Sequence, residues 1–178
     1  MKNHFTIEDE TAKVYSNGRY TADFFFIDRT DLENISAYSW RIYTTKNGYK
    51  RVETSINTGN NKIKHILLSR YLLNPPSGIY VDHIDCNPTN NRRANLRLAN
   101  RFENCQNAPK FIRGCSSIYK GVSWHTNKNK WIVSIMANNK SFHIGYFTDE
   151  ILAAKAYDQK AKELFGEFAN LNFPIVLP

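Results

Sequence analysis

The sequence has no long hydrophobic run. None of its apolar stretches approaches the ~20 residues that a helix needs to cross a bilayer. Residues 1–13 also lack the apolar segment of a secretory signal peptide. We therefore expect no membrane partner and an intracellular protein that stays in the compartment where it is made.

Cysteine is scarce and follows no metal-binding pattern. The three cysteines, Cys86, Cys105 and Cys115, include no Cys-x-x-Cys pair. This spacing excludes a disulfide framework and a four-cysteine zinc site. We expect reduced thiols and no structural zinc.

Acidic residues are fewer than basic ones. The 178 residues include 24 lysines and arginines but 16 aspartates and glutamates, which gives a formal net charge of +8. This excess favours a polyanionic partner, either nucleic acid or an acidic membrane surface. Hydrophobic residues make up 42% of the chain, enough to build a core, so a disordered chain is excluded. The length allows one large domain or two small ones.

Turn signals divide the first 80 residues into short strands. Asn17-Gly18 and Asn47-Gly48 are typical of hairpin turns, and Gly59-Asn60-Asn61 marks another turn. Residues 63–73 have apolar side chains at helical spacing and predict a helix that ends at Asn74-Pro75-Pro76.

The middle of the chain is more polar. Residues 81–85 predict a short strand that enters a polar loop over residues 86–91. Residues 94–107 predict a short helix with an irregular tail. Residues 109–116 contain a proline and a glycine and read as a linker, so we predict a domain boundary there.

A different rhythm follows the linker. Residues 121–124, 130–136 and 141–147 predict three strands separated by asparagine-rich turns. A helix is predicted from an N-cap at Thr148 to about Phe165. The three strands carry lysines and no acid, whereas the helix is acidic. This contrast favours a sheet that neutralises phosphates, although a solvated lysine-bearing sheet is the alternative.

One polar stretch has the residue types that phosphodiester hydrolysis requires. Val81-Asp82-His83-Ile84-Asp85 is followed by several asparagines, of which Asn95 and Asn104 are the most distant. A histidine suits the base that deprotonates water, and a hard divalent cation takes oxygen ligands from carboxylates. The residues alone leave open a hydrogen-bonded core pair and a run of turn-forming asparagines.

Taken as a block, residues 81–97 resemble the core of the His-Asn-His (HNH) homing endonucleases, a ββα-metal nuclease family common in phages and group I introns. The upstream pattern His65-x-x-Leu68-x-x-Tyr71-Leu72 resembles the lead-in helix of that family, with His65 expected in packing or a phosphate contact. The similarity spans about residues 52–107. It implies a ββα-metal nuclease core, double-stranded DNA as substrate and one divalent metal ion, Mg²⁺ or Mn²⁺.

The resemblance also implies a role for each motif residue. His83 would be the general base, and Asp82 would bind the metal. Asn95 would hold the loop and orient His83, whereas Asp85 is expected to cap the loop. Asn104 takes the position that is histidine in many relatives, and it would bind the metal through its side-chain oxygen, which suits Mg²⁺ or Mn²⁺ better than zinc.

Arginines crowd this region. Arg92, Arg93, Arg97 and Arg101 lie close in sequence to a single acid, Glu103. The planar fork of donors in arginine suits phosphate contacts. We expect these residues to line the DNA backbone near the cut, with a solvated basic helix as the alternative.

The last part of the chain is similar to the APETALA2-type DNA-binding domain. Five separated blocks occur in order over residues 117–174, from Tyr119-Lys120-Gly121-Val122-Ser123-Trp124 to Asn170-Leu171-Asn172-Phe173-Pro174. The resemblance implies a three-stranded antiparallel sheet that packs on one helix and lies in the major groove. Matching positions give these DNA contacts: Lys120, Ser123, His125, Lys130, Ser134, Met136 and His143. Plant relatives carry several arginines and tryptophans there, so we expect this chain to read a different sequence.

These observations together predict an α+β protein with two modules. Residues 1–108 would hold a strand-rich region and the nuclease core, and residues 117–174 the DNA-binding domain. We predict a site-specific, homing-type endonuclease that acts as a monomer on DNA, in the cytoplasm of a bacterial host if a phage encodes it. A catalytically inactive DNA-binding regulator and a restriction or defence nuclease with the same chemistry remain alternatives.

Overall fold

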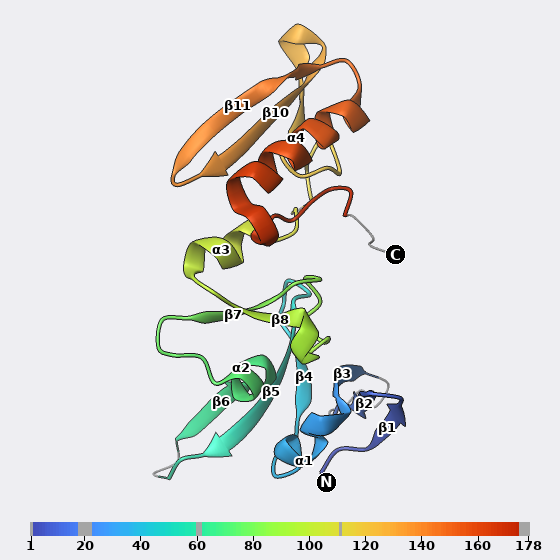
Figure 1. Cartoon of the computed structure of the whole chain (residues 1–178), viewed down its shortest axis with the longest axis vertical. Coiled ribbons are helices and arrows are strands. Elements are labelled where there is room, and N and C mark those ends of the chain that lie inside the picture. Colours follow the sequence, from blue (N-terminus) through green and yellow to red (C-terminus); the bar gives the residue numbers. More distant parts are fainter. Residues whose placement is uncertain (1, 18–22, 60–61, 111, 175–178) are drawn as a thin grey trace. The chain divides into compact units, whose positions relative to one another are not determined.

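The computed structural model describes residues 2–17, 23–59, 62–110 and 112–174. The chain divides into two compact units, Met1–Arg101 and Phe102–Pro178 (Figure 1). Helices and strands occur in both units, which confirms the prediction of a mixed fold. Gly18 and the pair Asn60-Asn61, which belong to two predicted turns, lie outside the described residues.

The first unit begins with an antiparallel sheet of three strands in the order β1-β2-β3. In β2 and β3, alternate side chains are fully buried, because successive residues of a strand point to opposite faces of the sheet. A short helical segment follows β3. The elements are β1 (Phe5–Glu8), β2 (Thr11–Tyr15), β3 (Phe24–Asp28), η1 (Arg29–Asp31) and α1 (Leu32–Ile35).

A second antiparallel sheet follows, built from β4 (Arg41–Thr44), β5 (Lys50–Asn57) and β6 (Ile63–Leu67). The helix predicted over residues 63–73 is wrong in its first half. Residues 63–67 pair with β5, and only α2 (Leu68–Leu73) is helical. Pairing with the preceding strand outweighs the local helical spacing, and Asn74 ends α2 in the left-handed conformation, with φ of 43°.

A two-stranded hairpin completes the first unit. It consists of β7 (Tyr80–His83) and β8 (Leu96–Ala99), and a 3-10 turn, η2 (Arg93–Asn95), precedes β8. The helix predicted to begin near residue 94 is therefore wrong there, because residues 96–99 pair with β7. The helix α3 (Arg101–Gln106) begins only afterwards, at the border between the units.

One hydrophobic core joins the parts of the first unit. Its fully buried members come from both three-stranded sheets, from α1 and α2, and from the segment before β4. Leu96 of the hairpin also belongs to it. The hairpin is therefore packed against the sheets. The largest buried side chains are Phe25, Ile27, Ile35, Trp40 and Leu68.

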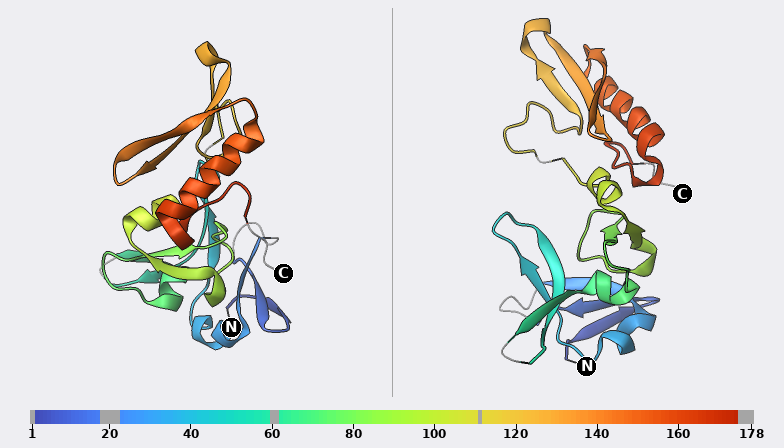
Figure 2. Two further views of the ribbon diagram at one scale, coloured as in Figure 1. Left: turned by 45° about the horizontal axis from the view of Figure 1, so that its top comes forward. Right: turned by 90° about the vertical axis from the view of Figure 1, so that its left-hand side faces the viewer.

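The second unit contains an antiparallel sheet in the order β9-β10-β11 and a long helix, α4 (Glu150–Phe165), which lies along one face of the sheet (Figure 1, Figure 2). The strands are β9 (Val122–His125), β10 (Lys130–Ala137) and β11 (Lys140–Phe147). A 3-10 turn, η3 (Thr126–Lys128), lies between β9 and β10, and another, η4 (Gly166–Phe168), follows α4. The N-cap of α4 is Asp149 and not Thr148 as predicted. Its carboxylate, one residue later, accepts a hydrogen bond of 2.7 Å from the Leu152 amide.

The core of the second unit depends on close approach between helix and sheet. Small residues of α4, Ala153, Ala154 and Ala161, are fully buried, and Tyr157 lies among them with 3% of its surface exposed. Gly121 has a φ of +76° and contacts the ring of Tyr157, so that a Cβ at this position would overlap the ring. Across the described residues of both units, no helix is long and apolar enough to cross a membrane.

Candidate active site

The hairpin presents Asp82 and His83 at the end of β7. Asp82 is buried, with 6% of its surface exposed, and its cross-strand neighbour on β8 is Arg97. The Nε of Arg97 donates a hydrogen bond of 2.9 Å to Oδ2 of Asp82, and Nη2 lies 2.8 Å from the same oxygen. This ion pair compensates a charge that would otherwise be costly to bury.

His83 is held by the side chain of Asn91. The Nε2 atom of His83 lies 3.2 Å from Oδ1 of Asn91, while Nδ2 of Asn91 donates to the carbonyl of Pro88 at 3.1 Å. The second contact fixes which end of the amide faces the histidine. Because an amide oxygen only accepts, the proton of neutral His83 lies on Nε2. The Nδ1 atom is then the nitrogen that can accept a proton.

Burial controls the protonation of His83. Desolvation is the largest influence and lowers the pKa of His83 below its ordinary value of 6.5. The hydrogen bond to Asn91 and the charges of Asp85 and Asp82 act in the opposite direction but do not reverse the shift. His83 is therefore neutral at pH 7, as a general base must be.

Asp85 organises the loop that follows β7. Its Oδ1 accepts hydrogen bonds from the Asn87 amide and from Nδ2 of Asn95, both at 2.8 Å. Its Oδ2 accepts one of 2.7 Å from Nδ2 of Asn90. These contacts confirm the prediction that Asp85 caps the loop. Both carboxylate oxygens of Asp85 therefore accept hydrogen bonds within the motif loop.

Asn95 holds the loop from the β8 side. Its side chain donates to Asp85 and to the carbonyl of Asn90, and its oxygen accepts from the Asp85 amide at 3.0 Å. These contacts link Asn95 to both Asp85 and Asn90 of the loop. A side-chain contact to His83 comes from Asn91. Nothing in the sequence distinguishes Asn91 from the neighbouring turn-forming asparagines.

The first sheet, β1-β2-β3, is hydrogen-bonded to this loop through its strand β3. The Phe26 amide of β3 donates to the carbonyl of Thr89 at 2.8 Å, and the Asn91 amide donates to the carbonyl of Phe26 at 2.7 Å. Asn91 is thus fixed by backbone and side chain alike, and only 1% of it is exposed. The N-terminal strands, whose role the sequence left open, serve as the platform of the motif loop.

The four predicted arginine contacts differ in their surroundings. Arg92 and Arg101 are exposed. The guanidinium of Arg93 forms two hydrogen bonds, of 2.9 and 2.7 Å, to the buried carboxylate of Asp31, which raises the pKa of Arg93 above its ordinary value. Arg93 and Arg97 therefore pair with carboxylates, and Nε of Arg92 donates to Oδ1 of Asn90 at 2.9 Å. Arg93 is exposed like Arg92 and Arg101, whereas Arg97 is half-buried.

The structure does not bring all the motif residues together within one unit. Asp82, His83 and Asn95 lie in the first unit, whereas Asn104 is half-buried on α3 in the second. Among the described residues, no three His, Cys, Asp or Glu side chains are grouped as metal ligands. The carboxylate of Asp82, the residue before neutral His83, is nevertheless the kind of oxygen donor that a hard cation such as Mg²⁺ prefers.

In the second unit, the sheet face opposite α4 carries most of the predicted DNA contacts. Ser123, Lys130, Ser134, Met136 and His143 are exposed there, and His125 is half-buried. Lys120 lies differently: its Nζ donates to the carbonyls of Gln106 and Ala108 at 2.7 and 2.6 Å.

The same face also contains an aromatic residue that sequence reasoning did not identify. The ring of Tyr146 packs against His143 and His125, with centroid distances of 4.7 and 5.5 Å, and Nζ of Lys128 lies 3.8 Å from its centroid. Tyr146 pairs with Ile132 on the outward face of the sheet. The alternation of inward and outward side chains along β11 was the sequence signal that could have identified it. The cluster adds aromatic rings and the ammonium group of Lys128 to this face.

Each of the two parts of the sequence is similar to a known protein family. A family model described as HNH endonuclease matches residues 74–106, and one described as AP2 domain matches residues 117–167. An uncharacterized HNH endonuclease of Acanthamoeba polyphaga mimivirus is 34% identical over 169 residues, which are 94% of this chain and 84% of that protein.

Two further relatives match one part each. Protein 3.8 of Escherichia phage T7 is 36% identical over 95 residues, covering 53% of this chain and 76% of that protein. An ethylene-responsive transcription factor of Arabidopsis thaliana is 41% identical over 63 residues, covering 34% of this chain and 34% of that factor.

Proposed function

This chain belongs to the HNH endonuclease family, and from that premise we propose that it is a site-specific, homing-type enzyme that cuts double-stranded DNA. The observation that carries the proposal is the arrangement at the end of β7, where neutral His83 is oriented by Asn91 and the preceding residue, Asp82, is held by Arg97. Its AP2 domain would select the site, and one chain would act as a monomer.

Each residue has a defined task in this proposal. Nδ1 of His83 accepts the proton of the attacking water, while Asn91 keeps the ring oriented through Nε2. Arg97 holds the carboxylate of Asp82 in place. Asp82 would bind Mg²⁺ or Mn²⁺, with Asn104 as a further oxygen ligand on the strength of the family resemblance alone. Such a cation would stabilise negative charge on the phosphate and the leaving oxygen.

The proposal is tested by plasmid cleavage with the wild-type chain and the variant His83→Ala, each with Mg²⁺ and with a chelator. We expect wild type to cut only with the metal, and His83→Ala to lose at least about 100-fold in rate, since general bases contribute roughly that much. DNA binding should persist in the variant. The exposed His4→Ala serves as the matched histidine control.

Two results would count against the proposal. Cleavage by His83→Ala at the wild-type rate would remove His83 from the chemistry. Sequence-specific binding by a wild-type chain that never cuts would identify a DNA-binding regulator whose nuclease part is inactive.

A further inference from the structure

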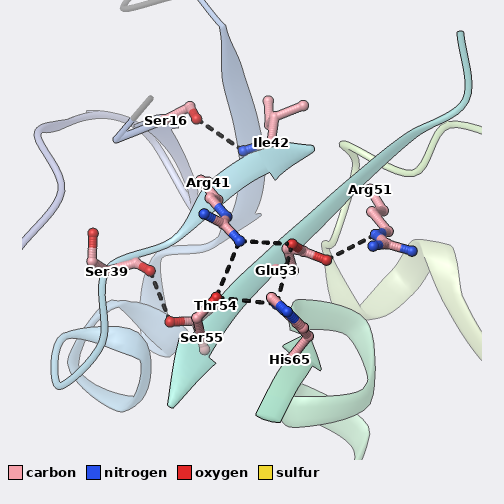
Figure 3. Close-up of polar contacts among 9 residues, drawn as sticks. All are labelled: Ser16, Ser39, Arg41, Ile42, Arg51, Glu53, Thr54, Ser55 and His65. Atoms are coloured by element: carbon pink, nitrogen blue, oxygen red, sulfur yellow. Dashed lines mark hydrogen bonds and ion pairs between the residues drawn. The ribbon is translucent and has the colours of Figure 1, made fainter. Parts of the chain in front are cut away.

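A cluster of charged side chains surrounds one buried carboxylate on the second sheet of the first unit. Glu53 of β5 has 1% of its surface exposed. Arg41 of β4 reaches its Oε1 through Nη2 at 3.2 Å, and Nδ1 of His65 on β6 lies 3.5 Å from the same oxygen. Nε of Arg51 lies 2.8 Å from Oε2, as an ion pair without hydrogen-bond geometry (Figure 3).

The cluster contains more positive charge than Glu53 requires. One carboxylate is neutralised by one guanidinium, yet two guanidiniums and an imidazole face it. The arginine side chains are also 44% and 40% exposed, whereas Arg97, which pairs with buried Asp82, is 12% exposed. Compensation of a buried charge therefore explains Arg97, but it leaves the surplus and the exposure of Arg41 and Arg51 unexplained.

Neighbouring groups hold the two guanidiniums in place. Nη2 of Arg41 also donates to Oγ of Ser55 at 3.1 Å, and the guanidinium of Arg51 lies 4.6 Å from the centroid of the Tyr43 ring. Ser55 in turn contacts Nδ1 of His65 at 3.1 Å. Guanidinium groups held in this way lose little conformational freedom when they bind an oxyanion. Their planar arrangement of donors matches a phosphate group, which favours phosphate as the ligand.

The cluster is continuous with the candidate active site. A cavity of about 60 Å³ is lined by Arg51 together with His83 and Asn91. On the other side, His65 lines a larger cavity of about 690 Å³ with Lys64 and Arg70. Positive groups therefore extend from His83 across the sheet to α2, all within the first unit.

We propose that Arg41, Arg51 and His65 form a phosphate-binding surface for the DNA strand that is cut, with Arg51 contacting the phosphate beside His83 and Glu53 positioning both arginines. The inference rests on the proposed nuclease function, since it takes DNA as the ligand. It gives the second sheet a role in substrate binding.

The first test separates the two arginines. Arg41→Ala should weaken DNA binding and reduce the slope of log affinity against log salt by about one, since one phosphate contact is lost. Arg51→Lys keeps the charge but loses the fork, so we expect a wild-type salt slope and a saturating rate about 10-fold lower or more. Lys155→Ala on α4, an exposed lysine of the second unit, is the control for loss of one positive charge.

The second test uses Glu53→Gln, which makes the surface more positive by one charge. Net charge alone predicts tighter DNA binding and unchanged cleavage. Loss of positioning predicts a lower saturating rate, at least several-fold, without weaker binding. Thermal melting checks that the variant is folded; if it is not, Arg41→Ala and Arg51→Lys decide the question.

The two proposals fail in different ways. If wild type binds DNA but does not cut it, the nuclease function fails, while the salt slope of Arg41→Ala still tests the surface. If wild type cuts and all three variants match it in affinity, salt slope and rate, the phosphate-binding surface is wrong.

Discussion

Among the described residues of the first unit, three carboxylates are buried, and each lies against at least one arginine. Asp31 contacts Arg93, Asp82 contacts Arg97, and Glu53 contacts two arginines. A buried pair adds little net stability compared with apolar residues, but loss of one partner leaves an uncompensated charge. These pairs therefore constrain which residues can be changed more than they raise stability.

Arg97→Met should destabilise the first unit strongly, because it leaves the buried carboxylate of Asp82 without its guanidinium. We expect a loss of about 3 kcal/mol in the free energy of unfolding, measured by urea denaturation at pH 7. Arg93→Met is the matched control, since Arg93 is 47% exposed and its pair is better screened. Equal losses for the two variants would contradict this explanation.

His83 of the metal-free protein should titrate below the ordinary histidine pKa of 6.5, as measured by NMR. The unfolded chain then binds the His83 proton more readily, so the stability contributed by neutral His83 is present above pH 6.5 and is lost as the pH falls through the lower folded pKa. Asn91→Leu should lower the pKa further, because the Asn91 hydrogen bond opposes the effect of burial. A pKa at or above 6.5 in wild type would refute the assigned cause.

At the level of elements, local signals located the strands of the second unit to within one or two residues. The turn Asn138-Asn139, with φ of 50° and 59°, determines where β10 ends and β11 begins. In contrast, residues 63–67 and 96–99 became strands only through pairing with other segments, β5 and β7. Local spacing does not contain that information.

The same distinction applies to the candidate site. Asp82, His83 and the loop-capping Asp85 were found because they lie in one block of sequence. The contact between Asn91 and His83 depends on the attachment of the loop to β3, and the cluster around Glu53 depends on the register of three strands. Neither could be predicted before the strands were paired.

Gly121→Ala should disrupt the packing of α4 on its sheet. The added Cβ would overlap ring carbons of Tyr157 and lie 2.8 Å from the carbonyl oxygen of Ser134. We expect the second unit to lose about 2–4 kcal/mol of stability in urea denaturation. Gly114→Ala is the control, since its φ of +75° carries the same backbone strain but no atom lies within 4 Å. Similar losses would show that strain, not overlap, is the cause.

At the scale of the whole molecule, we propose that the second unit selects the DNA site, whereas the first unit cuts and also contacts phosphates. The double variant Lys130→Ala, His143→Ala removes two exposed groups from the outward sheet face. We expect DNA affinity to fall about 10-fold or more, with little change in the rate at saturating DNA. Titration of labelled duplex and single-turnover cleavage measure the two quantities. A fall in saturating rate with unchanged affinity would reverse the assignment.

The border between the compact units has a consequence for the design of chimeric chains. The segment after α3 is tied to the second unit, because Nζ of Lys120 donates to the carbonyls of Gln106 and Ala108, and Lys110 donates to those of Tyr119 and Val122. A chimera joined between the two family matches would take the donors and acceptors of these hydrogen bonds from different parents. Chimeras that inherit α3 together with the sheet should therefore fold better than chimeras joined at residue 117. Exchange of the whole second unit would then also exchange Asn104.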